Sequence, residues 1–241
     1  MELLRERKKQ RDQRKLFQLY PDTGPLRREL YAKHLQFFAA GLTHRERAML
    51  AANRVGKTWG VGGYETALHL TGLYPDWWPG LRFEGPIDSW AAGDTSETTR
   101  DIVQLALMGP PDAIGTGLIP ADSIDGYPTR RSNIRDAFDT VRIKHVSGGT
   151  SRLGFKSYDQ GRKKFQGTAK HWIWLDEEPP AEVYTECVTR TMTTQGQVAC
   201  TFTPLEGMSD VTLMYLGDAE KDISTSAVSG GSESTPVEMN F

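Results

Sequence analysis

The sequence predicts an α/β fold in which a mostly parallel sheet is covered by helices on both faces. Short apolar runs of strand length alternate with segments of helical periodicity. Polar or acidic residues follow these runs, and ligands of parallel sheets bind beyond the carboxyl ends of the strands. The chain has 241 residues and an apolar content of 38%, which is enough for a sizeable core.

Helical periodicity and helix-ending residues predict five helices. They are expected at 1–20, 26–40, 57–70, from an N-cap at Asp94 or Thr95 through Leu107, and at 181–192. Core strands are expected at 48–52, 89–92, 171–175 and 197–202. An antiparallel hairpin is expected from 140–146 and 153–158, around Gly148-Gly149.

The composition excludes several classes of protein. No run of eighteen apolar residues exists, and the N-terminal MELLRERKKQ lacks the apolar region of a secretory signal. Two cysteines, Cys187 and Cys200, cannot form a disulfide framework or a four-ligand zinc site. These features indicate a reduced, cytoplasmic protein.

The net charge of −2 conceals a basic N-terminal segment. Residues 1–35 hold ten Lys/Arg against five Asp/Glu, whereas the rest of the chain holds 19 against 26. Charge runs of this kind usually form a solvated helix face. A phosphate-contacting or partner-docking arm is the alternative interpretation.

A phosphate-binding loop is predicted between the strand at 48–52 and the helix at 57–70. The pattern G-x-x-x-x-G-K-[ST] is matched except at its first glycine, which Ala51 replaces. Backbone N–H groups at the start of the helix would cradle phosphates, Lys57 would reach the β- and γ-phosphates, and Thr58 would hold Mg²⁺. The expected nucleotide-binding residues of this loop are Asn53, Arg54, Val55, Gly56, Lys57 and Thr58.

An acid pair follows the apolar strand Trp172-Ile173-Trp174-Leu175. Asp176 would reach the Mg²⁺ held by Thr58, and Glu177 would polarise the attacking water as a general base. An acidic helix start is the alternative, because Asp and Glu favour the first turn of a helix.

Two further motifs surround the loop and the acid pair along the chain. Thr203, in the strand-ending run Thr201-Phe202-Thr203-Pro204, could sense the γ-phosphate, although by spacing alone a strand that ends at a turn is the favoured interpretation. Upstream of the loop, the amide of Gln36 could bond an adenine edge. The alternative for that segment is an amphipathic helix that packs Phe37 and Phe38 in the core.

Taken in order, the segments ANRVGKT, HWIWLDEEPP and TFTP resemble the ATPase half of the large terminase subunit of tailed double-stranded DNA bacteriophages. The resemblance covers roughly residues 30–215. It implies a three-layer phosphate-loop (P-loop) NTPase of the catalytic-glutamate class, with ATP and Mg²⁺ as cofactors. It also implies candidate catalytic roles for Glu177, Arg54, Lys57 and Thr203, and metal ligation by Thr58 and Asp176.

The same resemblance implies partners and a place of action. They are double-stranded DNA bound without regard to sequence, a portal protein, a small terminase subunit, and a ring of copies, usually a pentamer, at the procapsid portal vertex in the host cytoplasm. The expected regions are a basic helical extension at 1–25, an ATPase domain at 26–215, and a lid, linker or mobile tail at 216–241. A nuclease domain after the ATPase is expected to be absent from this chain.

One position departs from the family pattern. Related proteins often carry Arg-Gly about ten residues before the catalytic Glu, where this chain has Gln166-Gly167. The charge-stabilising arginine is then Arg54 acting within one subunit, which we favour, or Arg162 acting on a neighbour. The other functions that the sequence leaves open are a helicase- or repair-type ATPase and a non-enzymatic portal- or DNA-binding fragment.

Overall fold

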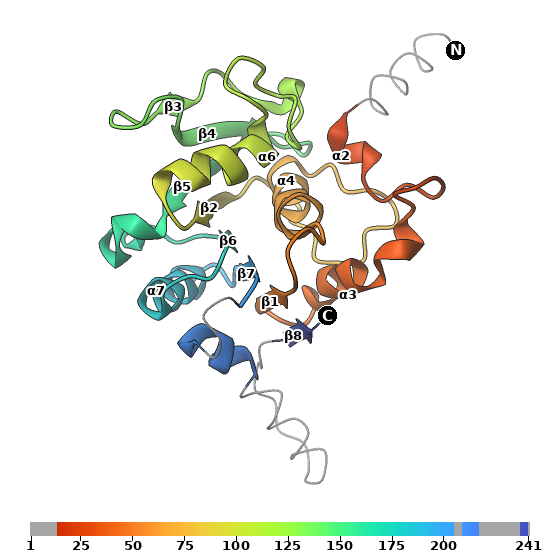
Figure 1. Cartoon of the computed structure of the whole chain (residues 1–241). Helices are drawn as coiled ribbons and strands as arrows, with labels where there is room; N and C mark the ends of the chain where they lie inside the picture. Colours follow the sequence, from red (N-terminus) through yellow and green to blue (C-terminus); the bar gives the residue numbers. More distant parts are fainter. Residues whose placement is uncertain (1–13, 205–208, 217–236, 241) are drawn as a thin grey trace.

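A computed structural model describes residues 14–204, 209–216 and 237–240. Its centre is an eight-stranded sheet of order β3-β4-β5-β2-β6-β7-β1-β8 (Figure 1). Strand β7 lies between β1, which leads into the predicted phosphate loop, and β6, which leads into the acid pair. The pairs from β5 through β2, β6, β7 and β1 to β8 are parallel, whereas β3–β4 and β4–β5 are antiparallel.

The strands closely follow the expected positions. They are β1 (Glu46–Leu50), β2 (Asp88–Gly93), β3 (Thr129–Arg130), β4 (Phe138–Lys144), β5 (Thr150–Ser157), β6 (Trp172–Asp176), β7 (Gln197–Phe202) and β8 (Val237–Asn240). The four predicted core strands and the predicted hairpin are therefore confirmed. Of the segment predicted as a lid, linker or mobile tail, residues 217–236 and 241 lie outside the described residues.

The helices connect these strands. They are α2 (Lys15–Gln18), η1 (Arg28–Tyr31), α3 (Ala32–Ala40), η2 (Lys57–Gly63), α4 (Tyr64–Thr71), α5 (Ser96–Thr98), η3 (Thr99–Gln104), α6 (Leu105–Met108), η4 (Ala121–Ser123), η5 (Tyr158–Gln160), η6 (Arg162–Phe165) and α7 (Ala181–Thr191). Thr95 caps α5 reciprocally with Thr98, which confirms one of the two expected N-caps. The described residues also include a helical segment at 210–216.

One helix prediction is partly wrong. The helix expected over 1–20 ends at Gln18, and residues 1–13 lie outside the described part of the chain. Tyr20 adopts a left-handed backbone with φ of 56° and donates its hydroxyl to the carbonyl of Gly60. Leu16 and Tyr20 are both buried in the main core, so tertiary contacts and not helical periodicity decide where this segment turns.

Two apolar cores lie on opposite faces of the sheet. One joins residues of α3, η2, α4 and α6 to inward side chains of β2, β4, β5 and β6. The other joins α7 and Phe165 to the opposite side of β1, β2, β6 and β7. Figure 1 shows α7 across the sheet from α4 and α6, which is the three-layer arrangement that the sequence predicts.

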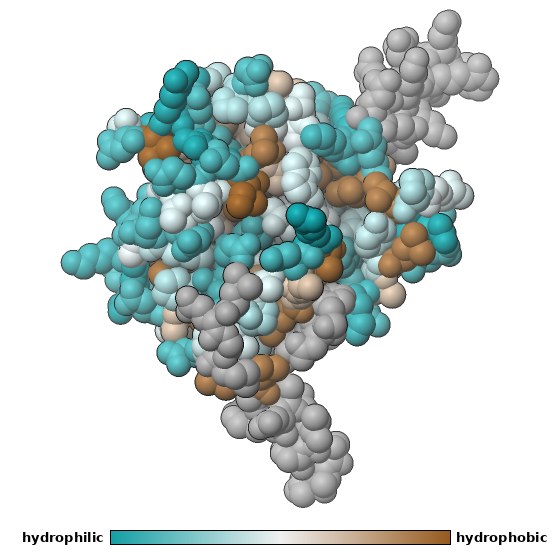
Figure 2. Space-filling view, in the orientation of Figure 1, coloured by the Kyte–Doolittle hydropathy of each residue, from teal (hydrophilic) through white to brown (hydrophobic). Residues whose placement is uncertain are grey.

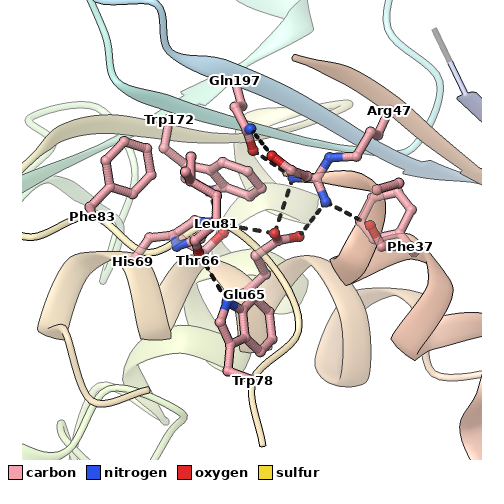
Figure 3. A network of polar contacts seen from close by, with 12 residues as sticks. Phe37, Arg47, Glu65, Thr66, His69, Trp78, Leu81, Phe83, Trp172 and Gln197 are labelled. Atoms are coloured by element: carbon pink, nitrogen blue, oxygen red, sulfur yellow. Dashed lines mark hydrogen bonds and ion pairs between the residues drawn. The ribbon is translucent and has the colours of Figure 1, made fainter. Parts of the chain in front are cut away.

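A buried network of polar contacts connects helices α3 and α4 to strands β1 and β7 (Figure 3). The Arg47 guanidinium on β1 donates to the Phe37 carbonyl at 2.8 Å, to Glu65 Oε1 at 3.0 Å and to Gln197 Oε1 at 2.9 Å. His69 Nε2 lies 3.3 Å from Glu65 Oε1, an ion-pair distance without hydrogen-bond geometry. Arg47, Glu65 and His69 are fully buried. Their contacts therefore fix the positions of α3, α4, β1 and β7 relative to one another.

The surface shown in Figure 2 is mostly hydrophilic, with apolar residues in small separate patches. Both Cys187 and Cys200 are buried free thiols. Among the described residues, none of the helices has the length and apolar character needed to cross a membrane.

Candidate nucleotide site

The predicted phosphate loop connects β1 to η2. Gly56 has φ of 89°, a left-handed conformation that favours glycine, and the helix begins at the next residue. The Lys57 ammonium is nearly buried and donates to the carbonyls of Ala51 and Ala52, each at 2.8 Å. The lysine therefore lies across its own loop, with its charge at the carboxyl end of β1.

The glycines that follow the loop have a packing role. A β-carbon at Gly62 would stand 2.0 Å from the indole nitrogen of Trp174, so only glycine allows this side chain of β6 against η2. The Trp174 indole donates to Thr201 Oγ1 on β7 at 2.7 Å. The first turn after the loop is thereby fixed against the strands that carry the acidic and Thr-rich motifs.

The Thr58 hydroxyl meets Asp176 at the end of β6. Thr58 Oγ1 lies 3.0 Å from Asp176 Oδ2 and 3.2 Å from Oδ1, and Thr201 Oγ1 donates to Oδ1 at 2.7 Å. Hydroxyl and carboxylate oxygens suit Mg²⁺, which is commonly held by one or two protein groups together with substrate phosphates. The described residues contain no group of three or more His, Cys, Asp or Glu that could hold a metal ion alone. The donor set therefore fits a nucleotide-bound Mg²⁺.

Burial changes the acidity of the acid pair. The pKa of Asp176 is raised to about 7: desolvation raises it most and the charge of Glu177 adds to the rise, while the hydroxyls of Thr201 and Thr58 and the ammonium of Lys57 oppose it. Desolvation also raises the pKa of Glu177, which Lys57 opposes and Asp94 supports. For Lys57, burial lowers the pKa, and both carboxylates counteract that shift. The three groups therefore form one electrostatic unit.

Glu177 stands on a constrained turn. Its φ is 65°, a left-handed conformation that costs a residue with a side chain of order 1–3 kcal/mol. The Tyr158 hydroxyl, buried after β5, lies 3.0 Å from the carbonyl of Asp176 and 3.1 Å from that of Glu177, so it can donate to either. The Glu177 amide donates to the Thr201 carbonyl at 3.0 Å. These contacts hold the side chain of Glu177 in a cleft shared with Asp94 and Thr203.

Thr203 lies beside the loop, as its predicted role requires. Its hydroxyl accepts a hydrogen bond from the Lys57 ammonium at 2.7 Å. The same oxygen lies 2.8 Å from the carbonyl of Ala51 and 3.0 Å from Asn53 Oδ1, either of which can accept its proton. Thr203 thus links the end of β7 to the predicted phosphate loop, beside the hydrogen bond from the Ala51 amide to the Phe202 carbonyl at 3.2 Å.

The structure does not gather every predicted residue. Arg54 lies on the loop with φ of 69° and an exposed side chain, and Val55 is half-buried. Gln36 is on the exposed side of α3, whereas His34 on the same helix is buried against the Val55 backbone, and burial lowers the pKa of His34 to about 4. Arg162 lies on η6 and pairs with Glu186 of α7 at 3.0 Å.

Sequence reasoning missed four residues of this site. Thr201 is named only as part of its motif and Asp94 only as a possible helix N-cap, and Tyr158 and His34 receive no role in the site. Asp94 carried a signal, because it follows a core strand as Asp176 does. The Tyr158 contact joins the end of β5 to the end of β6, which are separated in the sheet by β2, and no local pattern announces it.

The fold and this arrangement of loop, threonine and strand-end acids define the class of P-loop NTPases. Residues 48–227 match the family model described as terminase large subunit, T4likevirus-type, N-terminal. The chain is 36% identical over 242 aligned positions to the terminase large subunit of Salmonella phage P22, in a match that covers 92% of this chain and 46% of that relative. The chain therefore belongs to the terminase large subunit family, and it spans about half the length of this curated relative.

Solved structures agree on the fold. The large terminase of the thermophilic bacteriophage D6E, in complex with ADP, superposes with a TM-score of 0.59 at 12% identity, covering 87% of this chain and 44% of that one. A mutant ATPase domain of the Thermus phage P74-26 large terminase superposes with a TM-score of 0.52 at 15% identity, covering 82% and 76%. The three-layer, mostly parallel architecture is the one that these proteins share.

Proposed function

We propose that this chain is the ATPase part of a viral DNA-packaging motor and hydrolyses ATP by in-line attack of water. The observation that carries the proposal is the convergence of Lys57, Thr58 and Asp176 at one end of the sheet, with Glu177 beside them. Family membership and the ADP complex named for the phage D6E terminase support the nucleotide as ligand.

Each residue of the proposed site has a distinct role. Lys57 binds the β- and γ-phosphates, and the backbone amides of residues 54–58 orient them. Thr58 and Asp176 hold Mg²⁺, which when bound neutralises charge on the phosphate oxygens. Glu177 takes a proton from the attacking water, and its raised pKa moves it towards the range in which a general base works best. Thr203 reports the state of the phosphate end to the segment after β7.

We propose Arg54 as the charge-stabilising arginine. It stands on the loop itself, and its exposed side chain is free of ion pairs within the described residues. Arg162 is engaged by Glu186, which Arg190 also contacts at 3.0 Å, so it must leave a carboxylate before it can serve a neighbour. Arg54→Ala should abolish turnover at every protein concentration, whereas Arg162→Ala should not.

The work proposed for this activity is translocation of double-stranded DNA into a procapsid. The proposed partners are the portal protein, the small terminase subunit and further copies of the chain in a ring, a pentamer at the portal vertex in the host cytoplasm. Residues 26–215 form the proposed ATPase domain, 1–25 a basic extension and 216–241 a lid or linker. Gln36 stays the proposed adenine contact.

The function is tested by the acid pair. Glu177→Gln should keep nucleotide binding and lower the rate of ATP hydrolysis by about 10²–10⁴-fold, because an amide cannot accept the proton of water. Asp176→Asn should instead weaken Mg²⁺-dependent nucleotide binding. Glu182→Gln, an exposed acid on α7, is the matched control and should hydrolyse at the parental rate. Parental hydrolysis by Glu177→Gln would show that the base is assigned to the wrong residue.

A further inference from the structure

The far end of the sheet from β1 carries an unusual concentration of positive charge. Residues 130–170 hold eleven Lys/Arg against three Asp/Glu, in a chain whose net charge is −2. Strands β4 and β5 and the turn η6 supply most of these cations. This positive excess is larger than that of residues 1–35. It does not appear when residues 36–241 are counted together, because acidic residues elsewhere outnumber these cations.

The strand register places the cations on one face. Arg142 lies directly opposite Arg152 across the antiparallel β4–β5 pair, and Lys156 pairs in register with Ala92 of β2. Alternation puts Arg142, Lys144, Arg152 and Lys156 on the same side of the sheet, while Val141, Ile143, Leu153 and Phe155 enter the core on the other. We call these four cationic side chains the basic face.

In the part of the chain that the structure describes, no apolar core forms over the basic face. The core cluster on that side of the sheet includes Trp90 and Ala92 of β2 but no residue of β4 or β5. Lys156 lies with its ammonium 5.4 Å from the centre of the Trp90 ring, at the edge of that cluster. The apolar core beneath α7 and η6 thus ends at β2, and beyond it Arg142, Lys144 and Arg152 are exposed while Lys156 is half-buried.

Within the described residues, one of the four cations of the basic face has a carboxylate partner. Asp125 pairs with Arg142 at 2.9 Å, and Asp88 is engaged by Lys170 at 2.6 Å. Among the described residues, Lys144 and Arg152 have no ion pair. Burial lowers the pKa of Lys156 most, and Asp139 opposes this shift. The charges of Arg131, Lys164 and Lys170 lower the pKa further, so these cations lie close to Lys156. Like charges directly opposite one another destabilise a sheet, so this arrangement costs the fold stability.

The geometry points to the phosphate backbone of double-stranded DNA as the ligand of the basic face, an inference that rests on the proposed function. Outward side chains two residues apart on a strand stand about 6.8 Å apart and so present charge in regular rows. Phosphate contacts from Lys and Arg position a duplex without reading its sequence. A packaging motor must hold DNA of any sequence, and a flat cationic surface meets that need.

The features of the face favour DNA over a protein partner. The centre of a protein–protein interface is depleted in charge and enriched in large apolar side chains. Among the described residues, none of the exposed large apolar side chains lies on β4 or β5. The face also connects to the nucleotide site, because β5 continues into Tyr158, which contacts both Asp176 and Glu177, and into Asp159, whose amide donates to the Asp94 carbonyl at 3.1 Å.

The test compares two variants of the full chain that each lose four positive charges. The face variant combines R142Q, K144Q, R152Q and K156Q, and the arm variant combines R7Q, K8Q, K9Q and R11Q. Binding to labelled duplexes of about 30 base pairs and of two unrelated sequences is followed by fluorescence anisotropy between about 50 and 200 mM salt. The face variant should bind both duplexes at least about tenfold more weakly, with a slope of log K against log salt smaller by about 4, one per phosphate contact removed.

The controls separate this inference from the proposed function. The nucleotide affinity of the face variant should equal that of the parent, since none of its four residues touches the nucleotide site, and a cooperative thermal transition shows that the variant is folded. A parent that hydrolyses ATP but binds no duplex overturns the basic face alone. A parent that binds duplex through the face but hydrolyses no ATP supports the face and overturns the proposed function.

Two further outcomes overturn the inference. One is loss of duplex binding in the arm variant with parental binding in the face variant, which would place DNA on the N-terminal segment. The other is parental DNA binding by the face variant together with lost association between copies in sedimentation, which would make the face an interface between subunits.

Discussion

The two ends of the sheet differ in how their arginine side chains are placed. At the parallel end, Arg47 is buried under β1 and β7, and Glu65, Gln197 and the Phe37 carbonyl meet its guanidinium. At the antiparallel end, Arg142 and Arg152 oppose each other in solvent. A strand covered on both faces must satisfy any charge it carries, whereas an uncovered face can keep charge available for a ligand.

The largest expected effect on stability lies at the parallel end. Glu65→Ala should lower the free energy of unfolding by about 3–5 kcal/mol, because it leaves the Arg47 guanidinium buried without its counter-charge. Urea unfolding followed by tryptophan fluorescence measures this loss. Glu29→Ala, which removes the acid of the exposed Arg27–Glu29 pair, is the matched control and should cost at most about 1 kcal/mol. Equal losses in the two variants would mean that burial does not distinguish these pairs.

A second prediction concerns the pH dependence of the acid pair. Magnesium binding requires a deprotonated Asp176, whose pKa is about 7, so Mg²⁺-dependent ATP affinity should fall about tenfold per pH unit below pH 7. Calorimetric titrations in the Glu177→Gln background avoid hydrolysis. This background also lacks a carboxylate that raises the pKa of Asp176 and keeps Lys57, which lowers it, so the fall in affinity should begin at a lower pH there than in the parent. Asp176→Asn in that background should give a flat profile.

The effect of Asp176 on the free energy of unfolding runs in the opposite direction to its effect on ATP affinity. A carboxyl whose pKa is higher in the folded than in the unfolded chain binds its proton first in the folded state, so the contribution of Asp176 to stability rises as pH falls from above 7 towards 4. The pH dependence of the unfolding free energy, parent against Asp176→Asn, measures it. The unfolding free energy of the parent should rise relative to that of Asp176→Asn as pH falls from 8 towards 4. A parent that loses stability relative to Asp176→Asn over this range would contradict the sign.

A third prediction concerns the residue that joins the two ends. Tyr158→Phe removes the hydroxyl from the carbonyls of Asp176 and Glu177, and it should lower kcat about fivefold with little change in KM, in line with a net hydrogen bond of about 1 kcal/mol. Tyr184→Phe is the matched control, because that buried hydroxyl contacts Glu46 and Tyr215 on α7's side of the sheet. It should lose comparable stability and keep kcat. Equal changes in kcat would reduce Tyr158 to a packing residue.

The smallest expected effect lies at the antiparallel end. Arg152→Gln removes one member of an opposed like-charge pair, so the free energy of unfolding should rise by a few tenths of a kcal/mol at low salt, about 0.2–0.5. The gain should vanish at high salt as screening weakens the repulsion. Arg135→Gln, at a side chain that is 93% exposed beside Asp136, should show no such gain. A loss of stability in Arg152→Gln would contradict the inference that the two opposed arginines repel each other.

Local pattern was sufficient for most of the fold. The apolar runs of β1, β2, β6 and β7 and the glycine-punctuated helix after Gly56 are set by residues close in sequence, so their periodicity predicts them. The same holds for Thr58 and Asp176, because strand-end residues of neighbouring parallel strands meet at one edge of the sheet. Helix α3 shows the limit of the method, since local pattern could not tell that His34 is the side chain buried against the loop.

The sequence by itself determined the layers, the phosphate loop and the acid pair, because each depends on short-range periodicity and on residue types that follow strands. Tertiary structure alone decided that Tyr20 turns inward to Gly60, that Tyr158 reaches the Glu177 turn, and that Arg142 faces Arg152 on an uncovered sheet face. Those contacts depend on strand order and on where a helical layer ends. Both are set by the packing of the whole chain, which a window of neighbouring residues does not contain.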